Sequence, residues 1–160
     1  MEGWDNFFLA QAGASAALTG LLFVSVSINL AKILEVPTLP NRALQALILL
    51  FQILIMSSLM LIPHQSAAKL GIEVLTLALC VWILMVFYAI GNLRIAERSF
   101  RTYALISVGM SQLASLPYVV GGIFILLRGE AGIYWIAAGI LLAYAKSLLE
   151  AWVLLIEINR

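Results

Sequence analysis

The sequence contains few of the residues from which disulfides and metal sites are built. Among its 160 residues there is one cysteine, Cys80, and one histidine, His64. A single cysteine excludes an intrachain disulfide and a multi-cysteine metal site, and a single histidine excludes a multi-histidine site within one chain. The sequence also has no H-E-x-x-H, G-x-G-x-x-G, Walker, C-x-x-C or potassium-filter T-V-G-Y-G pattern. We therefore expect no catalytic residue, metal or cofactor of these kinds.

Charged residues are also scarce. They make up 11% of the chain, whereas apolar residues make up 64% and the mean hydropathy is +1.08. A soluble domain is about 25% charged and about 45–50% apolar, so this composition predicts a polytopic membrane protein. The net charge of +1 provides no basic face for nucleic acid and no acidic tail. The beginning "MEGWDNFF" is acidic where a signal peptide is basic, so we expect it to be retained.

Five stretches have the length of about 20 mainly apolar residues that a membrane span needs. Each is expected to be helical, because lipid offers no partners to free backbone groups. The connections between them are short, which predicts an all-α integral membrane bundle over residues 1–160 as a single transmembrane domain. The predicted spans are 7–31, 42–62, 70–93, 102–127 and 132–156.

The lysines and arginines of the loops predict the orientation. If the N-terminus is outside, six of them lie on the inner side and only Lys69 and Arg128 on the outer side, which favours an N-out, C-in topology. Aromatic residues agree, with Trp4 and Tyr134 at the outer edge and Trp152 at the inner edge. The six inner residues are Lys32, Arg42, Arg94, Arg98, Arg101 and Arg160.

Small residues at a spacing of four mark a helix-packing face in the first span, within "GASAALTG". Such pairs let two helices approach closely in a membrane. The packing residues are Gly13, Ala16, Ala17 and Gly20. Farther along the same span, Ser25, Asn29 and Lys32 form a polar stripe.

Polar side chains also form stripes on the second and fourth spans. They are consistent with hydrogen bonding between packed helices and with the lining of a polar path, and the pattern leaves both open. The stripe residues are Gln45, Gln52, Ser107, Ser111, Gln112 and Ser115.

The fourth span contains a proline within its apolar run. Pro117 cannot donate a hydrogen bond to the carbonyl of Leu113, so the helix is expected to bend there. Pro117, Gly121 and Gly122 therefore form a candidate hinge, or else a static packing feature. In the third span, Cys80 lies among leucine, alanine and valine, and we expect it in the core.

Two charges lie deep in the fifth span, in "AYAKSLLEAW". Lys146 is expected about 3 Å and Glu150 about 9 Å from the bilayer centre. The i,i+4 spacing places them on one face with Gly139 and Ala143, so they are expected to pair and to face protein or water. The remaining donors and acceptors are expected to find partners, for which the candidates are Gln45, Gln52, Ser111, Gln112 and Tyr144. The pair is either a structural staple or one side of a path.

The stretch "WDNFFLAQAGASAALTGLLFVSVSINL" is similar to the start of small bacterial polytopic membrane proteins of no established function. This resemblance implies the bacterial cytoplasmic (inner) membrane and assigns no role to any residue. Size and helical hairpins also resemble the glutathione-related membrane enzymes, yet "NLRIAERSFRTY" lacks their histidine and asparagine spacing.

Three functions remain open at this point. The first is an oligomeric ion channel or small-solute transport protein, a homo-oligomer in the lipid bilayer with a polar path around Lys146 and Glu150. The second is a regulatory subunit that docks on a larger membrane-protein partner through "GASAALTG". The third is a membrane enzyme or a lipid or ligand binder that uses Arg94, Arg98 and Arg101; an enzyme is less expected than the other functions.

Overall fold

The computed structural model describes residues 3–95 and 101–158, which consist of helices and the connections between them. All of these helices except α2 are long and apolar enough to cross a membrane. The sequence-based prediction of an all-helical chain with five helices of this kind is confirmed for the described residues. The helices are α1 (Asp5–Ile28), α2 (Leu30–Glu35), α3 (Leu39–Met60), α4 (Ala67–Ile95), α5 (Arg101–Arg128) and α6 (Ala131–Ile158).

The first long helix ends earlier than the predicted range 7–31, because the chain leaves helical geometry at Asn29. The Nδ2 group of this residue donates to the carbonyl oxygen of Ser25 at 2.9 Å, and its backbone lies at φ −103° and ψ 15°. An asparagine side chain that bonds the backbone one turn earlier competes with continuation of the helix. The residues that follow form the short α2, which the sequence did not predict. Its Ile33 is buried against the ends of α3 and α6.

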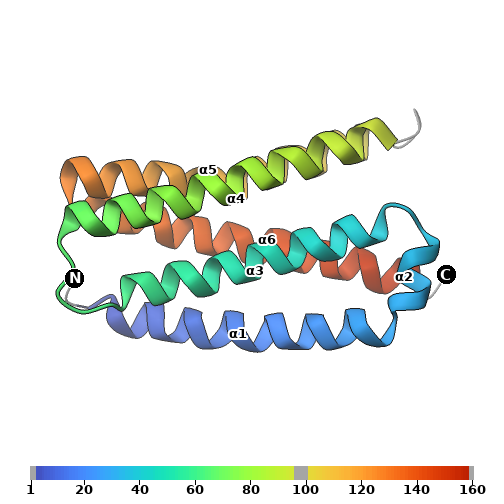
Figure 1. Ribbon diagram of the computed structural model, residues 1–160, viewed down its shortest axis with the longest axis horizontal. Helices are drawn as coiled ribbons and strands as arrows, with labels where there is room; N and C mark the ends of the chain where they lie inside the picture. The colour runs from blue at the N-terminus through green and yellow to red at the C-terminus, as the bar shows by residue number, and fades with distance from the viewer. Residues whose placement is uncertain (1–2, 96–100, 159–160) are drawn as a thin grey trace.

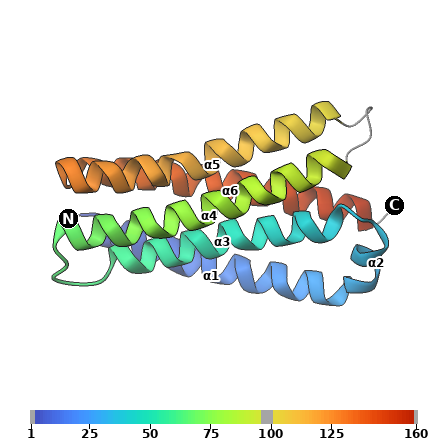
Figure 2. The ribbon, with the colours of Figure 1, turned by 45° about the horizontal axis from the view of Figure 1, so that its top comes forward.

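The long helices run side by side, with α3 and α6 in the middle of the bundle (Figure 1). α3 packs against α1, α4 and α6, while α5 packs against α4 and α6. α1 and α5 lie at opposite edges in both views (Figure 2). Only 11% of the most apolar window of α1 is buried, against 56% for α3, so α1 is a peripheral helix. The two ends of the bundle are called here the α2 end and the His64 end.

Glycines bring α4, α5 and α6 close together at the His64 end. A Cβ atom at Gly122 would lie 3.0 Å from the backbone of Leu75, and one at Gly132 would lie 2.5 Å from the carbonyl oxygen of Gly121. α5 continues as one helix through Pro117. Gly121 and Gly122 therefore serve close packing in this structure, and a hinge at these residues stays a prediction.

Cys80 lies on the exposed surface of α4, so its predicted place in the core was wrong. α4 packs mainly against α5 and less against α3, which leaves a wide face of the helix uncovered. In a helix that is apolar on all sides, the sequence does not reveal which face is turned outward.

Candidate functional site

The charged pair of α6 lies inside the bundle. Lys146 and Glu150 form the ion pair predicted from their spacing, and each side chain is only 3% exposed. Gly139 and Ala143, which begin the same face, are buried as well. This face of α6 therefore points into the interior of the protomer, as the prediction of a protein-facing or water-facing side requires.

Glu150 accepts hydrogen bonds from residues of three helices. Its Oε1 atom accepts from the Nζ of Lys146 and, at 3.1 Å, from the Oγ of Ser107 on α5. Its Oε2 atom accepts from the Nη1 of Arg42 on α3 at 3.0 Å. The Nζ of Lys146 also donates to the Oγ of Ser107 at 2.7 Å. We call Arg42, Ser107, Lys146 and Glu150 the charged cluster.

The charged cluster reaches the surface at the α2 end through Arg42. The side chain of Arg42 is 29% exposed, in contrast to the 3% of Glu150 behind it. Arg42 lies in the first turns of α3, close to the small core that α2 forms with α3 and α6. The site is therefore a buried ion pair with one cation that remains accessible to water.

Three of the predicted additional partners of the pair bond elsewhere. The Oε1 of Gln112 accepts from the Nε1 of Trp82 on α4 at 2.6 Å. The hydroxyl of Tyr144 donates to the carbonyl oxygen of Gln11 on α1 at 3.1 Å, and that of Ser111 donates to the backbone one turn earlier at 3.0 Å. Gln112 thus faces α4, although Ser111 directly before it faces the bundle interior. Neighbouring residues of a helix point in directions about 100° apart.

Further buried polar side chains lie between the charged cluster and the middle of the bundle. The Nε2 of Gln45, both amide atoms of Gln52 and the hydroxyl of Tyr118 have no hydrogen-bond partner in the described part of the chain. At a rise of about 1.5 Å per residue, Gln52 and Tyr118 both lie about 15 Å along the bundle from the cluster. Buried polar groups are normally bonded, and bound water is a common partner where protein atoms provide none.

Ser115 and Ser147 are two further buried polar residues. The hydroxyl of Ser115 donates to the carbonyl oxygen of Ser111 at 2.9 Å, and that of Ser147 donates to the carbonyl oxygen of Ala46 at 3.2 Å. Both hydroxyls are therefore bonded to the backbone. The bond of Ser115 joins two turns of α5, and the bond of Ser147 joins α6 to α3. Neither hydroxyl lacks a partner, in contrast to the amide of Gln52.

Sequence reasoning missed Arg42 as a site residue, since it was counted only as a loop cation. The signal was present, because Arg42, Gln45 and Gln52 recur at helical spacing on one face of α3. Tyr118 was missed because tyrosine in an apolar run is an ordinary core residue. Its ring packs against Gly139, where an added Cβ would lie 3.1 Å from the ring.

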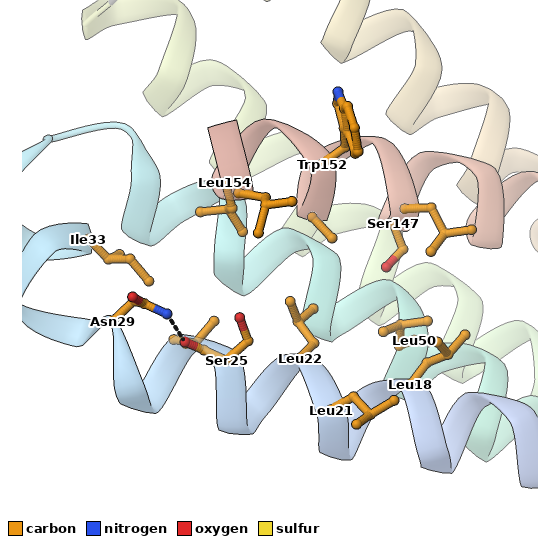
Figure 3. Close-up of a pocket in the computed structure, with 14 residues that line it drawn as sticks. Leu18, Leu21, Leu22, Ser25, Asn29, Ile33, Leu50, Ser147, Trp152 and Leu154 are labelled. Atoms are coloured by element: carbon orange, nitrogen blue, oxygen red, sulfur yellow. Dashed lines mark hydrogen bonds between the residues drawn. The ribbon is translucent and has the colours of Figure 1, made fainter. Parts of the chain in front are cut away.

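A groove of about 430 Å³ lies on the other side of α6, between α6, α1 and the middle of α3. Its walls are mainly leucines, with Ser25, Asn29 and Ser147 as polar members (Figure 3). The indole of Trp152 points away from the labelled leucines of α1 in this view. The predicted stripe of Ser25 and Asn29 thus faces this groove and not the charged cluster.

A second Lys–Glu pair at the His64 end provides a comparison. Lys69 and Glu73 of α4 have the same order and spacing, with Nζ and Oε1 3.9 Å apart, but their side chains are 66% and 32% exposed. Gln65 donates to Glu73 at 2.9 Å. The contrast shows that burial distinguishes the α6 pair from an ordinary surface pair.

A site at the arginines Arg94, Arg98 and Arg101 stays a prediction. Arg98 lies outside the described residues, as do the side chains of Arg94 and Arg101. Within the described ranges, no group of three or more histidine, cysteine, aspartate or glutamate residues could hold a metal ion. No family model, no curated protein and no solved structure matches this chain.

Proposed function

We propose that this protein is a multi-pass membrane transport protein that moves an ion or small solute through the interior of each protomer. The observation that carries the proposal is the charged cluster, which places an ion pair 3% exposed between α3, α5 and α6. Ionisable groups within membrane spans are costly and mark ion or substrate pathways. The orphaned amide and hydroxyl groups of Gln52 and Tyr118 support a continuation of the path toward the His64 end.

The proposal includes an N-out, C-in topology in a bacterial inner membrane. The surplus of lysine and arginine at the α2 end supports this orientation. Under it, Arg42 lies on the cytoplasmic side, and apolar side chains such as Met56, Ile136 and Ile140 fill the core beyond the charged cluster.

A flux assay in proteoliposomes tests the proposal. The wild-type protein is expected to release a trapped ion or solute, while Lys146→Leu and Glu150→Gln are expected to lower the rate by at least about tenfold. The matched controls are Lys69→Leu and Glu73→Gln, which alter the exposed pair of equal spacing and should leave the rate unchanged. Absence of flux, or equal rates in all four variants, contradicts transport through the cluster.

A second candidate function is that of a subunit that docks on a larger membrane protein or on a second copy. It is favoured by α1, where Gly13, Ala16, Ala17 and Gly20 are all exposed and a Cβ at Gly13 or Gly20 would meet nothing within 4 Å. Small residues of this spacing commonly contact another helix. Crosslinking in membranes tests it: Gly20→Leu should abolish a crosslinked species, and Gly109→Leu, at another open position, should not.

A further inference from the structure

The cations of the charged cluster outnumber its carboxylate. Lys146 of α6 and Arg42 of α3 both bind Glu150, so the described groups carry a formal charge of +1 around one buried carboxylate. Arg42 binds one oxygen, while Lys146 and Ser107 bind the other. Donors of this kind, with charges from two sides and a hydroxyl, are the usual recognition elements for carboxylate and other small anions.

We infer that Arg42 and Lys146 form a binding site for a small anion, and that Glu150 is a tethered carboxylate that occupies this site in the present structure. The inference rests on the proposed function, since it names the class of solute for the same site. A cation would have to approach a positive cluster and displace Lys146 from Glu150. An anion needs only to replace the glutamate, from the α2 end where Arg42 is exposed.

The charge balance of the cluster favours the entry of an anion. Two cations and one carboxylate carry a formal charge of +1, and a monovalent anion added to them brings the sum to zero. The anion takes the contacts of Glu150 with Lys146 and Arg42, and no covalent bond is made or broken. Entry of an anion therefore removes an unbalanced charge from a buried site, where such a charge is costly.

Binding of sodium nitrate and sodium acetate to the purified full-length protein tests the inference. Saturable thermal stabilisation is expected. Glu150→Gln, which keeps the shape but removes the competing charge, should bind at least about tenfold more tightly. Arg42→Gln should bind at least about tenfold more weakly, whereas Arg128→Gln, which removes the cation over Phe124, should match the wild type.

No saturable stabilisation of the wild type or Glu150→Gln overturns the inference, as does affinity that is indifferent to Arg42→Gln. If Glu150→Gln does not fold, the comparison of anion affinity between the wild type and Arg42→Gln decides. The flux assay separates this inference from the proposed function. Cation flux without anion binding refutes the anion site and leaves transport standing, whereas anion binding without flux refutes transport and leaves the anion site standing.

Discussion

Glu150 is the residue on which the charged cluster depends, because its two oxygens keep two cations together. Lys146 is 3% exposed and cannot reach water, whereas Arg42 is 29% exposed and can. Loss of the carboxylate therefore affects the two cations unequally. The lysine is left buried without a counterion, and the arginine can turn outward.

We expect Glu150→Leu to lower the free energy of unfolding by about 3–5 kcal/mol, because it strands a buried lysine. Lys146→Met combined with Glu150→Leu should restore most of this loss, since no buried charge is then unpaired. Thermal unfolding in detergent measures both. Glu73→Leu, in the exposed pair, should cost less than about 1 kcal/mol. Equal losses in the single and double variants would show that the pair is not coupled.

We expect Gln52 to lower the stability of the fold and to contribute to the proposed transport. Both of its amide atoms are buried without a partner among the residues that the structure describes, a situation that costs about 1–3 kcal/mol. Gln52→Met, of similar length, should therefore raise the melting temperature while it lowers the flux in proteoliposomes. A lower melting temperature with unchanged flux would mean that the amide is satisfied by bound water and serves only packing.

For single residues, the sequence predicted the contacts between side chains that are close in the chain. The pairing of Lys146 with Glu150 follows from four positions on one helix, and the structure contains it. The contacts of Glu150 with Ser107 and Arg42 span 43 and 108 positions. They depend on how three helices are rotated against one another, which the periodicity of a nearly all-apolar helix does not encode.

Among the helices, α5 and α6 approach each other closely at their shared turn. A Cβ at Gly132 would lie 2.6 Å from the backbone nitrogen of Ile125, whereas one at Gly20 of α1 would meet nothing within 4 Å. Gly132→Ala must therefore push two helix backbones apart, while Gly20→Ala adds a methyl group on an open surface.

We expect Gly132→Ala to destabilise the monomer by about 1–3 kcal/mol, as overpacking does. Gly20→Ala should leave it unchanged or slightly more stable, because alanine is the better helix former. Thermal unfolding of both in detergent decides. If the two variants have the same melting temperature, the α5–α6 turn accommodates the added methyl group and close packing there does not determine the stability.

The elements show where sequence reasoning reached its limit. Lengths of apolar runs located all five long helices, because a span of about 20 residues is a strong signal. α2 was not found, since the only sign of the break was Asn29, one turn after Ser25 and indistinguishable from a polar stripe. Helix partners were not predicted either, because glycines such as Gly122 and Gly20 look alike in sequence and differ only in what lies opposite.

In the whole molecule, the two termini lie at opposite ends of the bundle (Figure 1). Helices of membrane-spanning length are odd in number among the described residues. If they all cross, the α2 end and the His64 end face different compartments. Lys32 and Arg42 then share one side with the C-terminal end of α6.

Cysteine labelling in intact cells tests this orientation. In a Cys80→Ser background, Ser66→Cys at the His64 end should react with a membrane-impermeant maleimide, and Thr38→Cys at the α2 end should react only after the cells are opened. The reason is the surplus of cations at the α2 end, which retains that side in the cytoplasm. The reverse pattern would place Arg42 outside and would invert the proposed direction of access.

The ion pair of α6 is also relevant to how the chain enters the membrane. Lys146 and Glu150 belong to the same helix and lie one turn apart. They can therefore neutralise each other before α6 packs against any other helix. A lone lysine or aspartate at the centre of a span costs about 2.5–3.5 kcal/mol on insertion scales. The last helix can thus be inserted during synthesis as a neutral segment. Arg42 lies near the beginning of α3, so its side chain can stay at the lipid headgroups until the bundle assembles. Its contact with Glu150 can then form after the other contacts of the pair.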